Sequence, residues 1–237
     1  MQEVPDRILV VFAHPDDVDF GAAGTVVQWT NAGAEVTYCV VTDGDAGGSD
    51  PSISRAEMRE IRHREQEAAA EELGVKDVVW LGHPDGRVEA TLDLRRDIAR
   101  VIRQVRPLLV VAPSPDRMWE RIFASHPDHL AVGEAAICAV YPDARNPFAF
   151  PELEAEGLAA HTVPEVWLMG TPEPDVFVDV TDHLDRKLAA LRCHVSQSVD
   201  SDGELETRLR IYLLEYGRRA GWVDGRLAEA FRRITTG

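Results

Sequence analysis

The chain has 237 residues, which is enough for one α/β domain with a substantial hydrophobic core. Its 41 acidic and 25 basic residues give a net charge of −16, which argues against a nucleic-acid partner or an anionic membrane surface, because both bind clustered Lys and Arg. The three cysteines are widely separated and no apolar run is long enough to span a membrane, which predicts a cytoplasmic protein with reduced thiols and no membrane insertion.

The predicted elements alternate between strand and helix along most of the chain. Short apolar, β-branched runs predict strands at residues 7–13, 35–42, 77–81, 108–112, 164–170 and 175–179. Amphipathic stretches predict helices at residues 22–31, 54–73, 92–105, 129–141, 182–196, 204–220 and 227–234.

This alternation predicts the fold class. Nearly continuous apolar strands are what a parallel sheet requires when helices cover both of its faces. We therefore expect an α/β, Rossmann-like three-layer sandwich with a mostly parallel sheet. No segment resembles a linker, so we expect a single domain over residues 1–237, with the C-terminal helices from about residue 204 as an extension.

The tripeptide His-Pro-Asp occurs three times, and each copy follows a predicted strand. The copies begin at His14, His83 and His126, in surroundings too dissimilar for an internal repeat. In folds of this class the site lies outside the carboxyl ends of the strands, so we expect all three copies to reach the same edge of the sheet.

The first and third copies contain residue pairs that suit a metal ion. His14 and Asp17 form one pair, His126 and His129 form the other, and imidazole and carboxylate are ligands that suit Zn²⁺. A catalytic zinc uses three protein ligands, so these pairs would leave spare acid–base groups for metal-assisted hydrolysis. Taken singly, a capped helix start would explain the first pair, and a polar loop entering a helix would explain the second.

The middle copy has no second histidine or carboxylate at ligand spacing. Asp85 is followed by Gly86, which is a common turn signal. Asp85 also stands after a strand, where its carboxylate would be able to bind substrate hydroxyls. Both roles, structural turn and substrate contact, stay open for Asp85.

Several stretches resemble the LmbE-like, or PIG-L, family of zinc-dependent N-deacetylases. The resemblance rests on Ala13-His14-Pro15-Asp16-Asp17, residues 41–47, Arg62-x-x-Glu65 and His126-Pro127-Asp128-His129, and it continues to about residue 200. It implies an LmbE-like fold and a zinc-dependent hydrolase that removes an acetyl group from a small-molecule N-acetylglucosamine-like sugar or sugar conjugate. It also implies a homo-oligomer, since enzymes of this family often form oligomers.

The resemblance also implies roles for individual residues. By position, the zinc ligands fall on His14, Asp17 and His129, and the general base falls on Asp16. His126 corresponds to the histidine that stabilises the tetrahedral intermediate, and Asp128 would orient it.

Two further residues have alternative roles. Arg62 lies on a predicted helix, where it either contacts substrate hydroxyls or is a solvated side chain paired with Glu65. His194 resembles a family position near the site, where it would contact the substrate, but a helix-end cap would also explain it.

We therefore predict a zinc-dependent N-deacetylase. One alternative is an amidase of a larger or thiol-conjugated amide, and the other is a non-catalytic nucleotide- or sugar-binding module on the same scaffold. Carboxylates in the first strand–helix turn would repel phosphate, which argues against nucleotide binding. Another divalent cation would also fit the same ligands.

Overall fold

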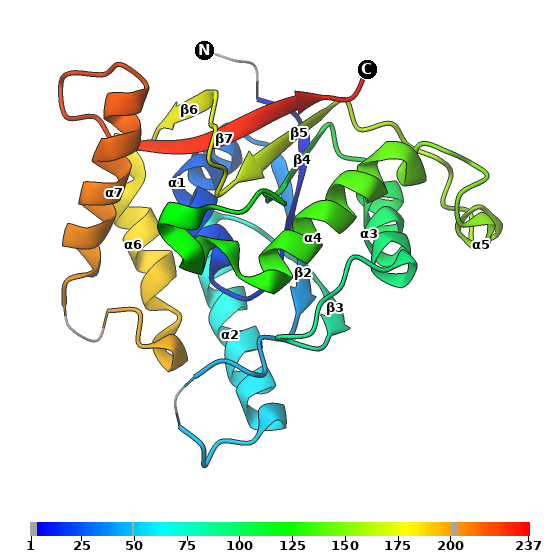
Figure 1. Ribbon diagram of the computed structural model, residues 1–237, viewed down its shortest axis with the longest axis horizontal. Helices are drawn as coiled ribbons and strands as arrows, with labels where there is room; N and C mark the ends of the chain where they lie inside the picture. The colour runs from blue at the N-terminus through cyan, green and yellow to red at the C-terminus, as the bar shows by residue number, and fades with distance from the viewer. Residues whose placement is uncertain (1–3, 49, 201–202) are drawn as a thin grey trace.

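The computed structural model describes residues 4–48, 50–200 and 203–237, and these residues form a seven-stranded sheet with helices on both faces (Figure 1). The strand order is β3-β2-β1-β4-β5-β7-β6. The parallel part comprises β1 (Arg7–Phe12), β2 (Glu35–Thr42), β3 (Asp77–His83), β4 (Leu109–Pro113) and β5 (Glu165–Met169). β7 (Ala228–Thr235) lies antiparallel between β5 and β6 (Val176–Asp179).

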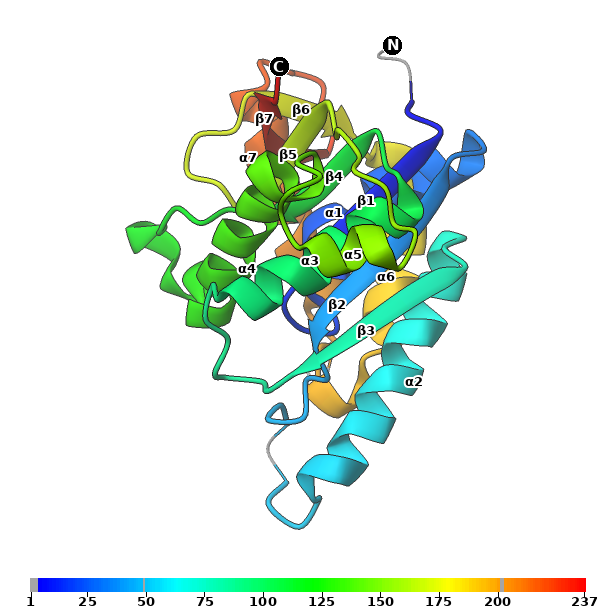
Figure 2. The same ribbon diagram turned by 90° about the vertical axis from the view of Figure 1, so that its right-hand side faces the viewer.

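The sheet is buried on both faces because its central strands are apolar at nearly every position. In β1, Ile8 and Val10 contribute to one core cluster, whereas Leu9 and Val11 contribute to the other. α1 (Asp17–Asn31) and α2 (Arg55–Leu73) cover the first face, with α6 (Leu184–Arg192) packed against them. α3 (Leu92–Val105) and α4 (Pro127–Cys138) cover the second face (Figure 2). The expected three-layer α/β sandwich with a mostly parallel sheet is confirmed.

The remaining helices lie outside this sandwich. α5 (Pro151–Ala155) is a short helix after α4, and α7 (Leu205–Arg219) packs against β7. Within the described residues, no helix is long and apolar enough to cross a membrane.

One predicted element is wrong. The helix expected at residues 227–234 is strand β7, whereas the six predicted strands and the other predicted helices are all present. Ala and Arg in this segment favour a helix locally. The segment nevertheless pairs with β5 on one side and β6 on the other, and this tertiary pairing overrides the local propensity.

α2 has strong local signals at both ends. Ser54 and Glu57 form a capping box at its start, and Gly74 takes a φ of 79° at its C-cap. Arg62 and Gln66 lie on the buried face of the helix. Buried polar side chains need partners, and both residues find theirs in the turn between β1 and α1.

Candidate active site

The first His-Pro-Asp copy forms the turn between β1 and α1. Asp16 is the N-cap of α1 and has a left-handed backbone, with a φ of 93°. Asp tolerates this conformation better than most residues, but surrounding contacts must still offset its cost. The backbone N–H of His14 donates to Asp17 Oδ2 at 2.8 Å. The turn therefore fixes the positions of these two side chains relative to each other.

The third copy begins α4. His126 is the N-cap, and its Nδ1 accepts a hydrogen bond from the backbone N–H of Asp128 at 3.2 Å. Because Nδ1 is the acceptor, a neutral His126 carries its proton on Nε2. Burial and the neighbouring His14 lower the pKa of His126, which favours this neutral form.

Two imidazoles and one carboxylate converge at the edge of the sheet. His129 Nε2 lies 3.2 Å from His14 Nδ1 and 3.0 Å from Asp17 Oδ1. One ligand atom from each of these three residues lies within 4.8 Å of the other two. Although burial favours the neutral carboxyl, His129 and His14 together hold the pKa of Asp17 well below its usual range. The number and type of donors are those of a catalytic zinc site.

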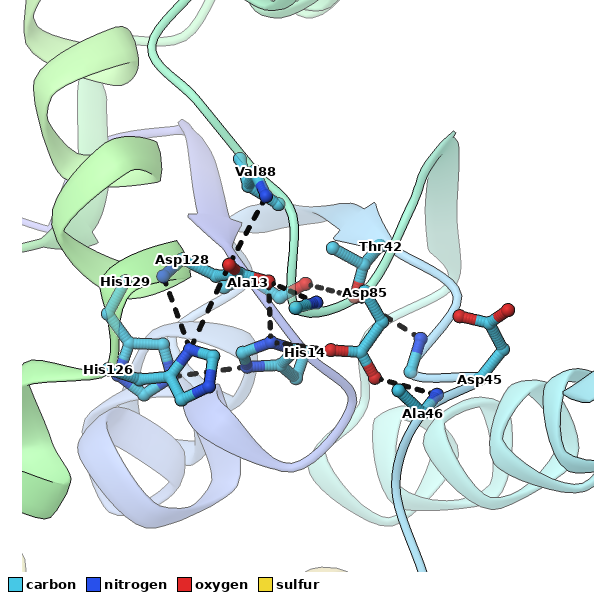
Figure 3. Close-up of polar contacts among 12 residues, drawn as sticks. Ala13, His14, Thr42, Asp45, Ala46, Asp85, Val88, His126, Asp128 and His129 are labelled. Atoms are coloured by element: carbon cyan, nitrogen blue, oxygen red, sulfur yellow. Dashed lines mark hydrogen bonds and ion pairs between the residues drawn. The ribbon is translucent and has the colours of Figure 1, made fainter.

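The second ring nitrogen of His14 faces two carboxylates (Figure 3). His14 Nε2 lies 3.1 Å from Asp85 Oδ1 and 3.2 Å from Asp128 Oδ2. Burial lowers the pKa of His14, but hydrogen bonds to Asp128, Asp17 and Asp85 outweigh this effect and raise the pKa to about 12. A metal-binding histidine usually gives its second nitrogen to a carboxylate, which fixes the orientation of the ring. Nδ1 is therefore the nitrogen of His14 that is placed to bind a metal.

A second set of donors, from His14, His126 and Asp128, meets the same distance limit. The two carboxylate oxygens of Asp128 already accept hydrogen bonds from the N–H groups of Gly86 at 2.8 Å and Val88 at 3.2 Å. The His126 side chain is also more open, because 43% of it is exposed. The first set is the better metal site, and it leaves His126 accessible to a substrate.

The middle copy joins the site through Asp85. Its Oδ1 faces His14, and its Oδ2 accepts a hydrogen bond from the N–H of Ala46 at 3.0 Å (Figure 3). His83 instead pairs with Asp97 at 3.2 Å. The sequence allows two roles for Asp85, a structural turn and a substrate contact. The structure adds a contact with His14 that residue spacing did not indicate.

Two residues of α2 hold Asp16. Arg62 Nη2 donates to Asp16 Oδ2 at 3.0 Å, and Gln66 Oε1 accepts a hydrogen bond from the backbone N–H of Asp16 at 2.8 Å. Arg62 is only 4% exposed, so it is not a solvated side chain, and its ion-pair partner is Asp16. A contact between Arg62 and substrate hydroxyls stays an untested prediction.

The pKa of Asp16 suits proton transfer. Burial and the neighbouring Asp17 carboxylate raise this pKa, whereas the positive charge of Arg62 lowers it. The net result is a pKa of about 7 for Asp16. A carboxyl group with a pKa near neutrality both accepts and returns a proton readily, which is what a general base that later acts as an acid requires.

A buried polar chain behind Asp16 was missed by the sequence analysis. Gln66 Nε2 donates to Asp19 Oδ2 at 3.1 Å, and His194 Nε2 lies 2.8 Å from the same oxygen. Gln66, Asp19 and His194 are all 0% exposed. His194 is thus linked to Asp16 through Asp19 and Gln66, and its predicted contact with substrate stays untested. One signal was available, because Gln66 follows Arg62 by four residues and so shares its helix face.

The chain matches a known protein family. Residues 9–140 match the family model described as PIG-L, GlcNAc-PI de-N-acetylase. The matched segment contains the donors His14, Asp17 and His129.

Individual relatives extend this match over nearly the whole chain. Diacetylchitobiose deacetylase from Thermococcus kodakarensis is 36% identical over 229 residues, which cover 96% of this chain and 83% of that protein. Probable N-acetyl-alpha-D-glucosaminyl L-malate deacetylase 2 from Bacillus anthracis is 32% identical and covers 84% of this chain and 85% of its own length. The solved structure of N,N'-diacetylchitobiose deacetylase from Pyrococcus horikoshii superposes with a TM-score of 0.90 at 33% identity, covering 98% of this chain and 84% of that one.

Proposed function

We propose that this chain, which belongs to the PIG-L family of de-N-acetylases, is a zinc-dependent hydrolase that removes the acetyl group from an N-acetylglucosamine-containing sugar. The chain is an enzyme that hydrolyses an amide bond, because the relatives that match it over most of their length are named deacetylases. Diacetylchitobiose and N-acetylglucosaminyl malate, the substrates in those names, both contain N-acetylglucosamine, which supports this substrate class. The observation that carries the proposal is the convergence of His14, Asp17 and His129 beside Asp16.

His14 Nδ1, an Asp17 carboxylate oxygen and His129 Nε2 would hold the zinc ion. When bound there, zinc polarises an amide carbonyl and lowers the pKa of water to about 7. The residues fit this ion because two imidazoles and one carboxylate converge, and because carboxylates hold the second nitrogen of His14. The same donors suit other divalent ions, so metal analysis decides the identity.

Asp16 takes the proton from the attacking water. The carboxylate adjoins the ligand residue Asp17 in the sequence, and Arg62 orients it through Oδ2. A raised pKa lets Asp16 return this proton to the nitrogen of the amide. The return is needed because an amide anion does not leave.

His126 stabilises the oxyanion that forms on the acyl carbonyl. The backbone N–H of Asp128 occupies Nδ1, so the Nε2 proton of His126 is free to donate to that oxygen. The Asp128 carboxylate lies 4.0 Å from His126 Nδ1 but 3.2 Å from His14 Nε2. Asp128 would therefore orient His126 mainly through its backbone, while its carboxylate orients His14.

The organisation of the whole chain is part of the proposal. We infer one catalytic domain over residues 1–237, in which the segment after residue 204 completes the sheet with β7, and a homo-oligomeric assembly. The pairing of β7 with β5 and β6 supports a single domain, and the family resemblance supports the homo-oligomer. Size-exclusion chromatography with light scattering tests the assembly.

Metal content and acetate release test the function. We expect stoichiometric zinc in the purified enzyme and acetate release from N-acetylglucosamine and N,N'-diacetylchitobiose. Asp16→Asn should retain zinc but release acetate about 10²–10⁴ times more slowly, and His14→Ala should lose zinc. Asp182→Asn changes an exposed carboxylate and is the matched control. Full activity in Asp16→Asn would contradict the assignment of the base, and a zinc-free active enzyme would contradict the metal.

A further inference from the structure

A cavity of about 590 Å³ adjoins the metal donors. Asp17 and His129 are among its lining residues, so the cavity reaches the side chains that would hold the metal. Its volume falls within the range of about 300–1,000 Å³ that is usual for small-molecule sites. The methyl group of an acetyl substrate would fill only a small part of it.

The wall of this cavity is largely apolar. Its apolar and aromatic side chains come from the end of β1, the start of α1, the loop after β4, the end of β5 and α7, and include Phe12, Phe20, Met118, Met169, Leu209 and Tyr212. Sugar hydroxyls that enter such a space lose their hydrogen bonds to water and find few replacements. The side chains of Asp85 and Arg62 can form hydrogen bonds to sugar hydroxyls, but neither residue lines the cavity.

Two arginines also line the cavity, and the guanidinium group of each contacts another residue of the protein. The Arg121 guanidinium lies 4.2 Å from the centre of the Tyr212 ring, and Arg208 Nη2 donates to the Val199 carbonyl at 3.1 Å. Arginine often covers apolar surface with its aliphatic stem while its charged head is held elsewhere. Their presence is therefore compatible with an apolar occupant.

We propose that this cavity receives the acyl chain of the amide, so that the enzyme cleaves glucosamine carrying longer acyl groups, such as hexanoyl and octanoyl, in addition to acetyl. This inference rests on the proposed deacetylase function and specifies its substrate class. In the reaction, the oxygen of water bonds to the acyl carbonyl carbon, the C–N bond breaks and the nitrogen takes a proton. The products are glucosamine and a carboxylate whose chain occupies the cavity.

A series of N-acyl glucosamines tests the proposal. Release of free amine is measured for the acetyl, butyryl, hexanoyl and octanoyl compounds with the zinc-loaded enzyme. We expect kcat/KM to rise about fourfold for each methylene that enters the cavity, since burial of one methylene contributes about 0.8 kcal/mol. The rise should end when the chain is longer than the cavity.

Two variants connect this preference to the cavity. Ala230, a cavity residue on β7, is 8% exposed, and Ala230→Leu should lower the ratio of octanoyl to acetyl kcat/KM at least tenfold by filling the space. If Ala230→Leu does not fold, Phe20→Ala removes an apolar wall at a residue that is 39% exposed and should lower the same ratio several-fold. Phe148→Ala is the matched control, because Phe148 is 89% exposed and outside the cavity lining.

The outcomes separate this proposal from the proposed function. Acetate release combined with much slower cleavage of longer acyl groups overturns the acyl cavity and leaves the deacetylase intact. If no compound is cleaved, the proposed deacetylase function is wrong. Thermal stabilisation by N-octanoylglucosamine then tests whether the cavity binds an acyl chain. Stabilisation that exceeds that by N-acetylglucosamine and is lost in Ala230→Leu supports the cavity, and equal or absent stabilisation overturns it.

Discussion

At the scale of single residues, the site depends on which partners each of the two ring nitrogens of His14 contacts. Nδ1 faces Asp17 and His129, whereas Nε2 faces Asp85 and Asp128. The backbone around Asp16 is equally specific, because its left-handed conformation presents its carboxylate to Arg62 and its N–H to Gln66. A substitution behind the site should therefore affect the chemistry by moving Asp16.

Gln66→Leu should lower kcat and leave zinc content and KM nearly unchanged. Leucine is similar in size but neither accepts the hydrogen bond from the Asp16 N–H nor donates to Asp19. A displacement of about 1 Å in a catalytic group costs about 10²-fold in rate. Steady-state kinetics and metal analysis on the same preparation measure both effects.

Two controls separate positioning from general damage to the fold. Gln104→Leu makes the same change at an exposed position on α3 and should be neutral. Gln66→Asn keeps a neutral amide that both accepts and donates hydrogen bonds, and it should retain more of kcat than Gln66→Leu. Equal kinetics in the wild type and Gln66→Leu would show that Asp16 does not need this hydrogen bond.

At the scale of elements, one buried ion pair joins α6, α1 and β7. Lys187 Nζ donates to Glu229 Oε1 at 2.7 Å and to the Asp19 carbonyl at 2.9 Å. Glu229 in turn accepts hydrogen bonds from the N–H groups of Gly24 at 3.0 Å and Thr25 at 2.8 Å. These contacts hold the helix that carries Asp17 against the strand that pairs with β5 and β6.

Lys187→Met should lower the free energy of unfolding by about 3–5 kcal/mol, because it leaves the buried Glu229 charge without its partner. Urea denaturation measures this change. Lys76→Met removes the other lysine of the chain at an exposed position and should change stability little. Adding Glu229→Gln to Lys187→Met should recover part of the loss, and a loss below about 1 kcal/mol in Lys187→Met would rule out a strong contribution from the pair.

At the scale of the whole molecule, the metal donors connect the two helical layers. Asp17 begins α1 on one face of the sheet, and His129 lies in the first turn of α4 on the other. His14, at the end of the central strand β1, lies between them. A metal held by all three would fasten both layers to the sheet at this edge.

Removal of the metal by a chelator should therefore lower the melting temperature. Metal at 100 to 1,000 times its Kd stabilises a folded protein by about 2.7–4.1 kcal/mol. For a chain of this size, each kcal/mol corresponds to about 2–4 °C, so we expect a decrease of roughly 5–15 °C. Differential scanning calorimetry with and without chelator measures it. His14→Ala should not respond to the chelator, and an unchanged melting temperature in the wild type would contradict a structural link through the metal.

The sequence by itself determined most of the elements and the edge of the sheet where the site lies. Strands β1, β2, β4 and β5 are recognisable because burial on both faces requires nearly continuous apolar runs, and the partly buried strands β3 and β6 are recognisable from their β-branched and aromatic residues. The three His-Pro-Asp copies lie at the carboxyl ends of β1, β3 and β4, which are strands of the same parallel sheet, so their arrival at one edge follows from the fold class. The donor types of His14, Asp17 and His129 were also readable, since they depend on residue identity.

Only the tertiary structure decided which groups touch. The sequence of β7 predicts a helix, but the segment is a strand because it pairs with β5 and β6. Asp19 and His194 are 175 positions apart and Asp16 and Gln66 are 50 apart, yet both pairs are in contact. Local patterns report which face of an element is buried. They do not report which distant side chain meets a buried donor or acceptor there, because that pairing is set by the packing of whole helices and strands.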